Sequence, residues 1–492
     1  MKIFCRPIAL SRTLKRLARP DRAGVAVRAV ALAAVAAVAG DACAGDIDAE
    51  AAWSRSVARA IYAELVGLDT RTFSGDTARA AEAMAEHFRA AGFPAEDIHV
   101  FTPAPRKGDL VVRLRGTGWR RPILLLAHLD VVDADRADWS VDPFVLTERD
   151  GFFYGRGSDD DKYMASAFIA SLLRFKREGF VPDRDLVLVL ETDEEILDAN
   201  GVGIRWLIRN HFDLIDAEFA LNEGGSVSVK GGRVRWNSIQ TSEKMSITFR
   251  LEVHNPGGHS AVPLKDNAIY RLAAGLERLA RLEFPVRLSD NVRRWLETAA
   301  THETGQRAED LRSAASAAPS AAALERLSRD PELNAQLRTT CVATMLEGGH
   351  APNALPQLAA ATVNCRLLPG ESAASVQETL VSTLGDSAIS VRQTGTLTVS
   401  PPSTPPEDLV RAARRLTEEF WPGTPVVPVM SAGATDGSFL RNAGIPTFGH
   451  SGLAVDGADV HAHGRDERIP VASYERGVEY LYRLIKAVSG GG

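Results

Sequence analysis

Histidine and carboxylate side chains, which bind divalent metal ions in proteins, gather in five short runs of this chain. The runs are His128-Leu129-Asp130, Asp159-Asp160-Asp161, Asp193-Glu194-Glu195, Asn222-Glu223 and His461-Ala462-His463. Each run alone also fits a helix cap, a turn or a solvated loop. Neighbouring carboxylates repel one another, however, unless a cation or another partner offsets their charge. Their recurrence favours a metal site in which one carboxylate stays free to act as a base.

Apolar stretches precede three of these runs and are typical of buried strands. We expect strands over Asp109–Leu114, Ile123–Ala127, Leu186–Leu190 and Ala217–Leu221, and helices over Ala49–Leu65, Asp76–Ala91, Lys162–Arg177 and Val202–Asn210. Strands that alternate with helices predict an α/β fold, a mostly parallel sheet covered by helices.

Ligands of such sheets lie at the carboxyl ends of the strands. We therefore expect one His, one Asp, two Glu and a further His to meet at strand ends of this one sheet. Histidine and carboxylate ligands with a shared bridging carboxylate suit two zinc ions, or cobalt or manganese.

The pattern changes near Ser242, where SITFRLEVH alternates as a half-exposed strand. The expected order of elements from there is strand, helix, two strands, helix and strand, which is that of a ferredoxin-like α+β unit. They are Ser246–His254, Asn267–Leu282, Cys341–Leu346, Leu358–Leu368, Ala373–Leu384 and Ile389–Gln393. We expect residues 242–399 to be inserted into a catalytic domain formed by residues 45–241 and 400–492. Residues 284–339 are expected to form a helical insertion within the inserted domain.

The first 44 residues differ in composition from the rest. They contain eight of the 57 Lys and Arg residues but only two of the 63 Asp and Glu residues, and Ala29–Gly40 is apolar. That stretch is too short to span a bilayer, and Ala42-Cys43-Ala44 has the form of a cleavage site. We interpret residues 1–44 as a signal peptide and expect an exported protein, periplasmic or secreted; a transit-type leader is the alternative.

Without that leader, 49 basic and 61 acidic residues remain, a net charge near −12. This charge argues against nucleic acid or an anionic membrane as a partner. Only Cys341 and Cys365 remain as well. A hairpin centred near Asn353 would place them opposite each other, either as a disulfide or as two buried thiols.

Taken together, the motifs resemble the dinuclear zinc peptidase family that includes aminoacylase, glutamate carboxypeptidase, carboxypeptidase S and succinyl-diaminopimelate desuccinylase. HLDVV is similar to the first zinc motif of that family, and GRGSDDDK to its Gly-Arg-Gly-small-x-Asp-x-Lys motif. The resemblance runs from about Ala51 to the C-terminus, without the helical insertion. LRTTCVATMLEGGHAPNALP and GATDGSFLRNAGIPTFGHSG look most like the carboxypeptidase S branch.

The resemblance implies a role for each residue of the site. One zinc ion would be held by His128, Asp160 and Glu223, and the other by Asp160, Glu195 and His463. Asp130 would orient His128, and Glu194 would be the general base. In the terminal motif a glutamate follows the histidine by four residues, so Glu467 selects His463 rather than His461.

Further residues are implied to contact the substrate. His259 resembles a histidine that stabilises the oxyanion, often in the active site of the partner subunit, so a homodimer is expected. Asn353 and Arg366 resemble substrate-holding residues, and Arg suits a carboxylate bidentately. Gly433 and Thr435 resemble a carboxylate-cradling loop, although Ala434 stands where a second glycine is usual.

The sequence thus predicts an exopeptidase or N-acyl-amino-acid amidohydrolase for small peptides or acylated amino acids with a free α-carboxylate. One rival is a protein that keeps the fold and binds ligands without catalysis. The other is a serine hydrolase, against which the lack of a Gly-x-Ser-x-Gly motif argues. The lack of a His-Glu-x-x-His motif likewise argues against a one-zinc protease.

Overall fold

The computed structural model of the protein describes residues 49–395 and 397–490. The chain divides into two compact units, Met1–Trp53 and Ser54–Gly492, and the features below belong to the second. The predicted signal peptide, residues 1–44, lies outside the described residues. Among the described helices, none is both long and apolar enough to cross a bilayer.

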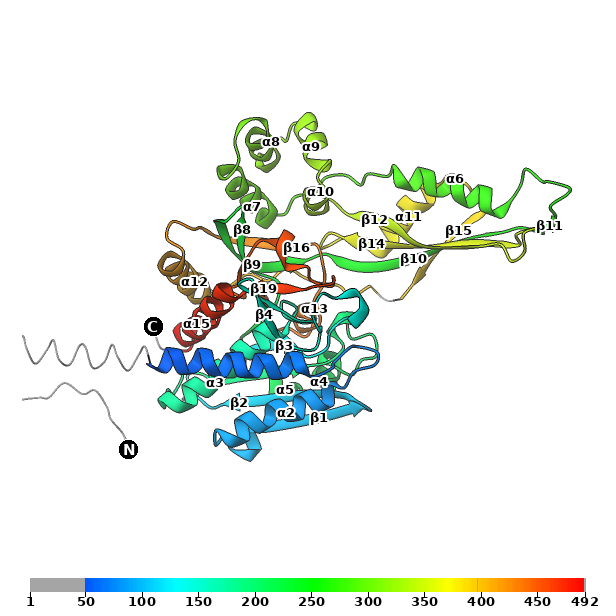
Figure 1. Ribbon diagram of the computed structural model, residues 1–492. Coiled ribbons are helices and arrows are strands. Elements are labelled where there is room, and N and C mark those ends of the chain that lie inside the picture. The colour runs from blue at the N-terminus through cyan, green and yellow to red at the C-terminus, as the bar shows by residue number, and fades with distance from the viewer. Residues whose placement is uncertain (1–48, 396, 491–492) are drawn as a thin grey trace, which may run out of the picture. The chain divides into compact units, whose positions relative to one another are not determined.

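A ten-stranded sheet forms the centre of the fold (Figure 1). Its central strands β6, β3, β7 and β17 are parallel, and antiparallel pairs flank them. Every residue of β3 and β6 is buried, as expected of apolar strands covered on both faces. In spatial order the strands are β1 (Ile98–Ala104), β2 (Lys107–Leu114), β6 (Leu186–Glu191), β3 (Ile123–His128), β7 (Phe219–Asn222), β17 (Thr447–Gly449), β9 (Arg233–Glu243), β8 (Val227–Lys230) and β18 (Ala454–Val455), with β16 (Val426–Ser431) beside β9.

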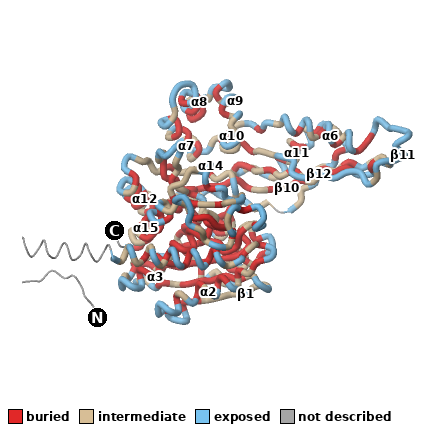
Figure 2. The backbone as a smooth tube through the Cα atoms, viewed as in Figure 1, coloured by how far each residue is buried: buried red, intermediate tan, exposed pale blue. Residues whose placement is uncertain are grey.

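Helices cover this sheet, and Figure 2 shows its strands as the buried centre of the unit. Leu124 and Leu126 of β3 pack with apolar residues of α4, α5 and α13, and α3 lies against β3 and β6. The helices are α2 (Thr77–Ala90), α3 (Lys162–Glu178), α4 (Ile204–Asn210), α5 (Phe212–Ile215), α12 (Glu407–Phe420), α13 (Gly437–Asn442), α14 (Gly457–Val460) and α15 (Val471–Val488), with residues 54–67 also helical. Short 3-10 turns are η1 (Ala95–Asp97), η2 (Arg136–Asp138) and η3 (Glu194–Ile196).

The ends of the predicted helices follow from their capping residues. Asp76 caps α2 by accepting a hydrogen bond from the N–H of Arg79. Gly179 ends α3 in the left-handed conformation that glycine adopts most easily. These two helices match the predicted ranges to within one residue at each end.

A separate three-stranded sheet corrects one prediction. It consists of β19 (Arg468–Pro470), β5 (Phe152–Tyr154) and β4 (Thr147–Arg149), in that order. Asp160 follows β5 and His463 precedes β19, so these two residues do not lie at strand ends of the central sheet. The expectation that all five metal-binding candidates share one sheet edge is therefore wrong for them.

Residues 245–394 contain a second, antiparallel sheet with the predicted ferredoxin-like order of elements. Its strands lie in the order β12 (Thr340–Gly348), β14 (Leu358–Leu367), β10 (Met245–His254) and β15 (Ile389–Thr394). Helices α6 (Ala268–Ala280) and α11 (Ala373–Leu384) cover one face and share its apolar core. We call this unit the inserted sheet. At its far end β11 (Gly258–His259) pairs with β13 (Ala354–Leu355) as a separate two-stranded sheet (Figure 1).

The two cysteines of the inserted sheet lie directly opposite each other on β12 and β14 and form a disulfide. The predicted hairpin register is confirmed, and of the two alternatives for the cysteines the structure has the disulfide.

The helical insertion consists of α7 (Asp290–Thr301), α8 (Gly305–Ala315), α9 (Ala321–Ser328) and α10 (Pro331–Leu337). Its apolar residues, including Val292 and Leu296, share a core with Trp236 of β9 and Met430 of β16. The insertion therefore packs on the edge of the central sheet.

His450 gives a stability prediction, because it is fully buried between two fixed partners. Its Nδ1–H donates to the Ser238 carbonyl at 2.7 Å, and its Nε2 accepts from the Tyr480 hydroxyl at 2.8 Å. Burial lowers the pKa of His450 to about 4. An unfolded histidine titrates near 6.5, so protons bind the unfolded chain first. This stabilising contribution is present above about pH 6.5 and is lost as the pH falls towards 4.

We expect the free energy of unfolding to fall by about 2 kcal/mol between pH 7 and pH 5 through His450 alone. Urea unfolding of the wild type and of His450→Gln at both pH values isolates this contribution as the difference between the two slopes. Equal pH slopes for the two proteins would contradict the prediction.

Candidate functional site

Parallel strands bring four of the predicted residues to one edge of the central sheet. β3 ends at His128, β6 leads into Glu194 and Glu195 on η3, and β7 leads into Glu223. Because β6, β3 and β7 are parallel neighbours, their carboxyl ends lie side by side.

Asp160 lies between two histidines. Its Oδ1 atom is 2.9 Å from Nε2 of His128, and its Oδ2 atom is 3.0 Å from Nε2 of His463. Nε2 of His463 is also 2.9 Å from Oε2 of Glu195. A carboxylate that turns one oxygen towards each histidine has the arrangement needed to bridge two metal ions.

Two overlapping groups of side chains could hold metal ions. His128, Asp160 and Glu195 form one, and His128, Glu194 and Glu223 form the other; within each group the ligand atoms lie within 4.8 Å of one another. Imidazole nitrogens with carboxylate oxygens are a donor set that zinc, cobalt and manganese accept. The residues present therefore fit divalent metal ions.

The electrostatics of the cluster favour binding of a cation. Burial raises the pKa of Glu194, and the nearby carboxylate of Glu223 raises it further. Burial and the charge of Asp160 raise the pKa of Glu223 in the same way. Burial alone would also raise the pKa of Asp160, but hydrogen bonds from His128 and His463 outweigh it and hold that pKa well below the usual value. A cation placed among these groups would stabilise all the charged carboxylates.

Asp130 supports the cluster differently from the predicted way. The Nδ1–H of His128 donates to the main-chain carbonyl of Asp130 at 2.9 Å, whereas the Asp130 carboxylate is 3.7 Å away. That carboxylate accepts hydrogen bonds from the main-chain N–H groups of Glu194 and Glu195 at 3.2 and 3.3 Å. Asp130 thus fixes the histidine tautomer through its backbone and η3 through its side chain.

Glu467 fixes the acidic turn around Asp160. It is fully buried, and its Oε1 atom accepts from the N–H groups of Asp159 and Asp160 at 2.7 and 3.2 Å. Its Oε2 atom accepts from Arg156 at 2.5 Å. From the motif, Glu467 was predicted only to select His463 as the ligand. The structure adds that this one side chain joins the His463 loop to the Asp160 loop.

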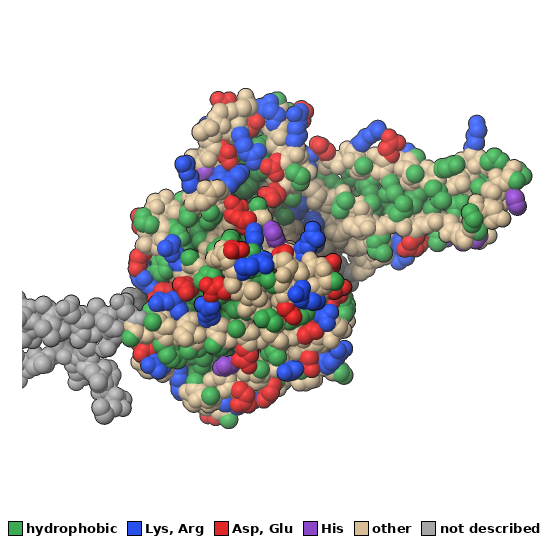
Figure 3. Space-filling model, in the orientation of Figure 1, with side chains coloured by type: hydrophobic (Ala, Val, Ile, Leu, Met, Phe, Trp, Pro, Cys, Tyr) green, Lys and Arg blue, Asp and Glu red, His purple; other side chains and the backbone are tan. Residues whose placement is uncertain are grey.

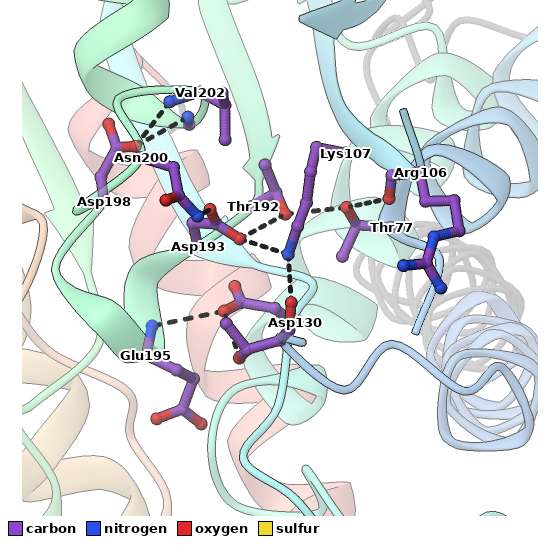
Figure 4. A network of polar contacts seen from close by, with 12 residues as sticks. Thr77, Arg106, Lys107, Asp130, Thr192, Asp193, Glu195, Asp198, Asn200 and Val202 are labelled. Atoms are coloured by element: carbon purple, nitrogen blue, oxygen red, sulfur yellow. Dashed lines mark hydrogen bonds and ion pairs between the residues drawn. The ribbon is translucent and has the colours of Figure 1, made fainter. Parts of the chain in front are cut away.

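An ion pair between Lys107 and Asp193, not predicted from the sequence, also holds η3 (Figure 4). Lys107 of β2 contacts the buried carboxylate of Asp193 at 2.5 Å and donates to the main-chain carbonyl of Thr72. The second oxygen of Asp193 accepts from Asn200 at 2.8 Å. Asp193 has a φ of +69°, a conformation uncommon for a residue with a side chain. Its position directly before Glu194-Glu195 was the only signal in the sequence.

His259, predicted to stabilise the oxyanion, and Asn353, predicted to hold the substrate, lie together beside the β11–β13 pair at the far end of the inserted sheet, rather than in the cluster. The N–H of Ser260, beside His259, donates to the Asn353 carbonyl at 3.0 Å. His259 is exposed, and its ring is held by the N–H of Ala261, which donates to Nδ1 at 3.0 Å. Neither metal-binding group among the described residues includes His259.

The remaining predicted substrate-binding residues lie where the chain crosses between the two sheets. Arg366 is on β14 opposite Ser246, and burial lowers its pKa. Thr435 gives both its N–H and its hydroxyl to the buried carboxylate of Glu243, at 3.1 and 2.9 Å. Thr435 therefore ties its loop to the buried Glu243, while Gly433 in the same loop is exposed.

A cavity of about 700 Å³ opens beside η3. Ile196 and Leu197, directly after Glu195, form part of its lining, together with Met245 and Ile247 at the start of the inserted sheet. Its size is that of a pocket for a small molecule. The metal-binding candidates thus lie next to a pocket with a partly apolar lining.

Comparison with known proteins identifies relatives over most of the chain. The model of a family described as peptidase family M20/M25/M40 matches residues 124–487. The human N-fatty-acyl-amino acid synthase/hydrolase PM20D1 is 29% identical over 375 residues, which cover 74% of each protein. Probable carboxypeptidase S-like 2 of Dictyostelium discoideum is 28% identical over 377 residues, 74% of this chain and 71% of that protein.

Among solved structures, the M20 family metallo-carboxypeptidase Sso-CP2 from Sulfolobus solfataricus is similar with a TM-score of 0.65. The similarity covers 87% of this chain and 98% of that one at 18% sequence identity. At that level of identity the likeness concerns the fold.

The pair of Lys107 and Asp193 yields a prediction for the site. Lys107→Met should lower the free energy of unfolding by about 3 kcal/mol, because it leaves a buried carboxylate without its cation. Adding Asp193→Asn should restore much of that loss, since no buried charge is then left unpaired. Urea unfolding of both single variants and the double variant measures the coupling. Arg106→Met, at the exposed neighbouring position, is the control. Additive effects of the two substitutions would rule out the coupling.

Proposed function

Because this chain is a metallopeptidase belonging to peptidase family M20/M25/M40, we propose that it hydrolyses the amide bond of small peptides or N-acyl amino acids with a free α-carboxylate. The observation that carries the proposal is the position of Asp160 between His128 and His463, with Glu194 and Glu195 beside them. In this proposal residues 45–241 and 400–492 form the catalytic domain, and residues 242–399 form a lid that carries the helical insertion.

The proposed metal sites follow the resemblance of the motifs to the family, because the two groups of side chains in space divide these residues differently and neither contains His463. His128, Asp160 and Glu223 would hold one zinc ion, and Asp160, Glu195 and His463 the other, with cobalt or manganese as possible replacements. When bound, such ions lower the pKa of a water molecule and polarise the amide carbonyl.

Glu194 is the proposed general base. It lies in the cluster, yet its side chain is free of the hydrogen bonds that hold Asp160 and His463. It would take the proton of the attacking water and hand it to the leaving amine when the C–N bond breaks. The Asp130 carboxylate, which holds the N–H of Glu194, would keep this base in place through both steps.

The substrate would lie in the cavity beside η3. Its lining includes apolar residues such as Ile196 and Met245 and the buried residue Lys244, whose ammonium group donates to the main-chain carbonyl of Arg338 at 2.8 Å. Arg366, close enough to Lys244 to affect its pKa, would hold the α-carboxylate. Gly433 would contribute its exposed main chain, whereas Thr435 would act only by fixing the loop. The names of the relatives, an N-fatty-acyl-amino acid synthase/hydrolase and a probable carboxypeptidase S-like protein, support both substrate classes.

A homodimer would bring His259 to a second active site. β12 is an edge strand of the inserted sheet, and its residues from Val342 to Gly348 are exposed. Hydrophobic side chains gather along this unit (Figure 3), with Met345 and Leu346 more than half exposed. An unpaired strand with exposed apolar residues is suited to pairing with another chain. In the dimer, His259 of the partner subunit would stabilise the oxyanion, with Asn353 beside it.

Export of the protein is also part of the proposal. The Cys341–Cys365 disulfide supports it, because disulfides persist in oxidising compartments such as the periplasm. Cleavage after Ala44 would release the protein to the periplasm or the medium.

Replacement of the proposed base separates catalysis from metal binding. Glu194→Ala should retain two metal ions per subunit while hydrolysis of N-acyl amino acids and dipeptides falls by about 100-fold or more. Elemental analysis and a product assay measure the two properties. In the wild type, a chelator should abolish activity, and zinc should restore it.

The same measurements test the rival proposals. Loss of metal from Glu194→Ala would mean that Glu194 is a ligand and not the base. A wild-type protein without metal, and inactive after zinc is added back, would favour a binding protein without catalysis. Chelator-resistant activity would favour a metal-independent hydrolase.

Mixing two inactive variants tests the role of His259 across the dimer. His259→Ala and Glu194→Ala each lack one group, but a heterodimer would contain one complete site. An equal mixture that exchanges subunits should regain about a quarter of wild-type activity, because half of the dimers are mixed and each has one working site. Differently tagged subunits confirm the exchange by co-purification. No recovery in a mixture that has exchanged would place His259 in its own subunit's site or outside catalysis.

A further inference from the structure

A second cavity, of about 670 Å³, lies between the helical insertion, α12 and β16. α7 of the insertion and α12 both lie against β16, in agreement with Figure 1. None of the proposed metal-binding residues lines this cavity. Its size falls in the range of pockets that hold small molecules.

One side of the cavity is lined by apolar residues that are almost completely buried. Ile239 of β9, Val292 of α7, Leu368 after β14 and Met430 of β16 all line it, and each is at least nine-tenths buried. These residues come from the central sheet, the helical insertion and the inserted sheet, so the folded unit as a whole holds the apolar wall in place. An apolar wall of this kind suits an aliphatic group.

The rest of the lining carries a surplus of positive charge. Arg287, Arg294 and Arg414 line the cavity, against the carboxylates of Asp290 and Glu371. Glu371 is already engaged, at 3.4 Å from Arg287 and by a hydrogen bond from the Thr339 hydroxyl. Within the described part of the chain, no ion pair involves Arg294 or Arg414. The surplus suits a ligand with a single negative charge.

Two further features favour an anion here. The side chain of Ser242 is 1% exposed and lines the cavity, and its hydroxyl has no hydrogen-bond partner among the described residues. Buried hydroxyls normally have such a partner. The N-terminus of α7, a helix of 12 residues, also contributes Ser289 and Asn291 to the lining. The N-terminal end of a helix carries partial positive charge that favours anions.

We propose that this cavity is a second binding site, separate from the metal centre, for a carboxylate that bears an aliphatic chain. The chain would lie on the apolar wall, and the carboxylate would take its hydrogen bonds from Arg294 and Arg414. Arginine suits this role because its planar guanidinium binds carboxylates in pairs of hydrogen bonds. Free fatty acids and N-acyl amino acids both have this chemistry. The site gives the helical insertion a function, since α7 supplies Val292, Arg294 and the helix end.

Calorimetric titration of the full metal-loaded protein with decanoate tests the proposal. We expect one decanoate per subunit, with binding retained after chelator treatment, because the metal centre does not form the site. Butyrate, which lacks most of the chain, and decanol, which lacks the charge, should bind at least 10-fold more weakly. N-decanoylglycine, titrated in parallel with decanoate into the chelator-treated protein so that it is not hydrolysed, distinguishes the two sources, since the tighter ligand of the two identifies the class that fits the cavity.

Substitutions of lining residues test whether decanoate binds in this cavity. Arg294→Ala/Arg414→Ala should weaken decanoate binding at least 10-fold, and Val410→Trp, on the α12 wall, should abolish it by filling the cavity. Arg411→Ala is the control, because Arg411 lies on the same helix but does not line the cavity. Circular dichroism and metal content confirm that each variant is folded. Absence of saturable decanoate binding, its loss with the metal, or unchanged binding in both lining variants would overturn the proposal.

Discussion

The carboxylates of Asp160, Glu194, Glu195 and Glu223 meet around His128, and their mutual repulsion is the constraint on which the rest of the site depends. Such a group is stable when other segments of the chain fix its backbone and a cation offsets the carboxylate charges. Hydrogen bonds from main-chain N–H groups fix the backbone. Three of the four residues lie on or beside turns whose amides donate to buried carboxylates from other segments of the chain. The fold thus uses one set of buried acids to hold another set in place.

Much of this arrangement could be predicted, because short apolar strands and the residues that follow them leave a clear local signal. β3 and β6 are continuous apolar runs, and parallel pairing requires that their carboxyl ends meet. The elements of the inserted sheet were predicted to within a few residues, since each alternates or repeats with the period of its structure. The cysteine register followed from the same pattern, as Cys341 and Cys365 are equally distant from the turn to within a residue.

The parts that could not be predicted depend on contacts between distant segments. The three-residue strands β5 and β19 are too short for any periodicity, so the location of Asp160 and His463 on a separate sheet was hidden. Lys107 reaches Asp193 across 86 positions, and Glu467 reaches Asp160 across 307. Nothing local marks such partners.

The contacts of Asp160 have a consequence for folding. Asp160 touches His128 at the end of β3 and His463 before β19, and its main-chain N–H is held by Glu467. These segments lie far apart in the sequence, so the arrangement forms only when the central sheet and the three-stranded sheet are both folded. Local unfolding of either sheet would therefore dismantle the whole cluster at once.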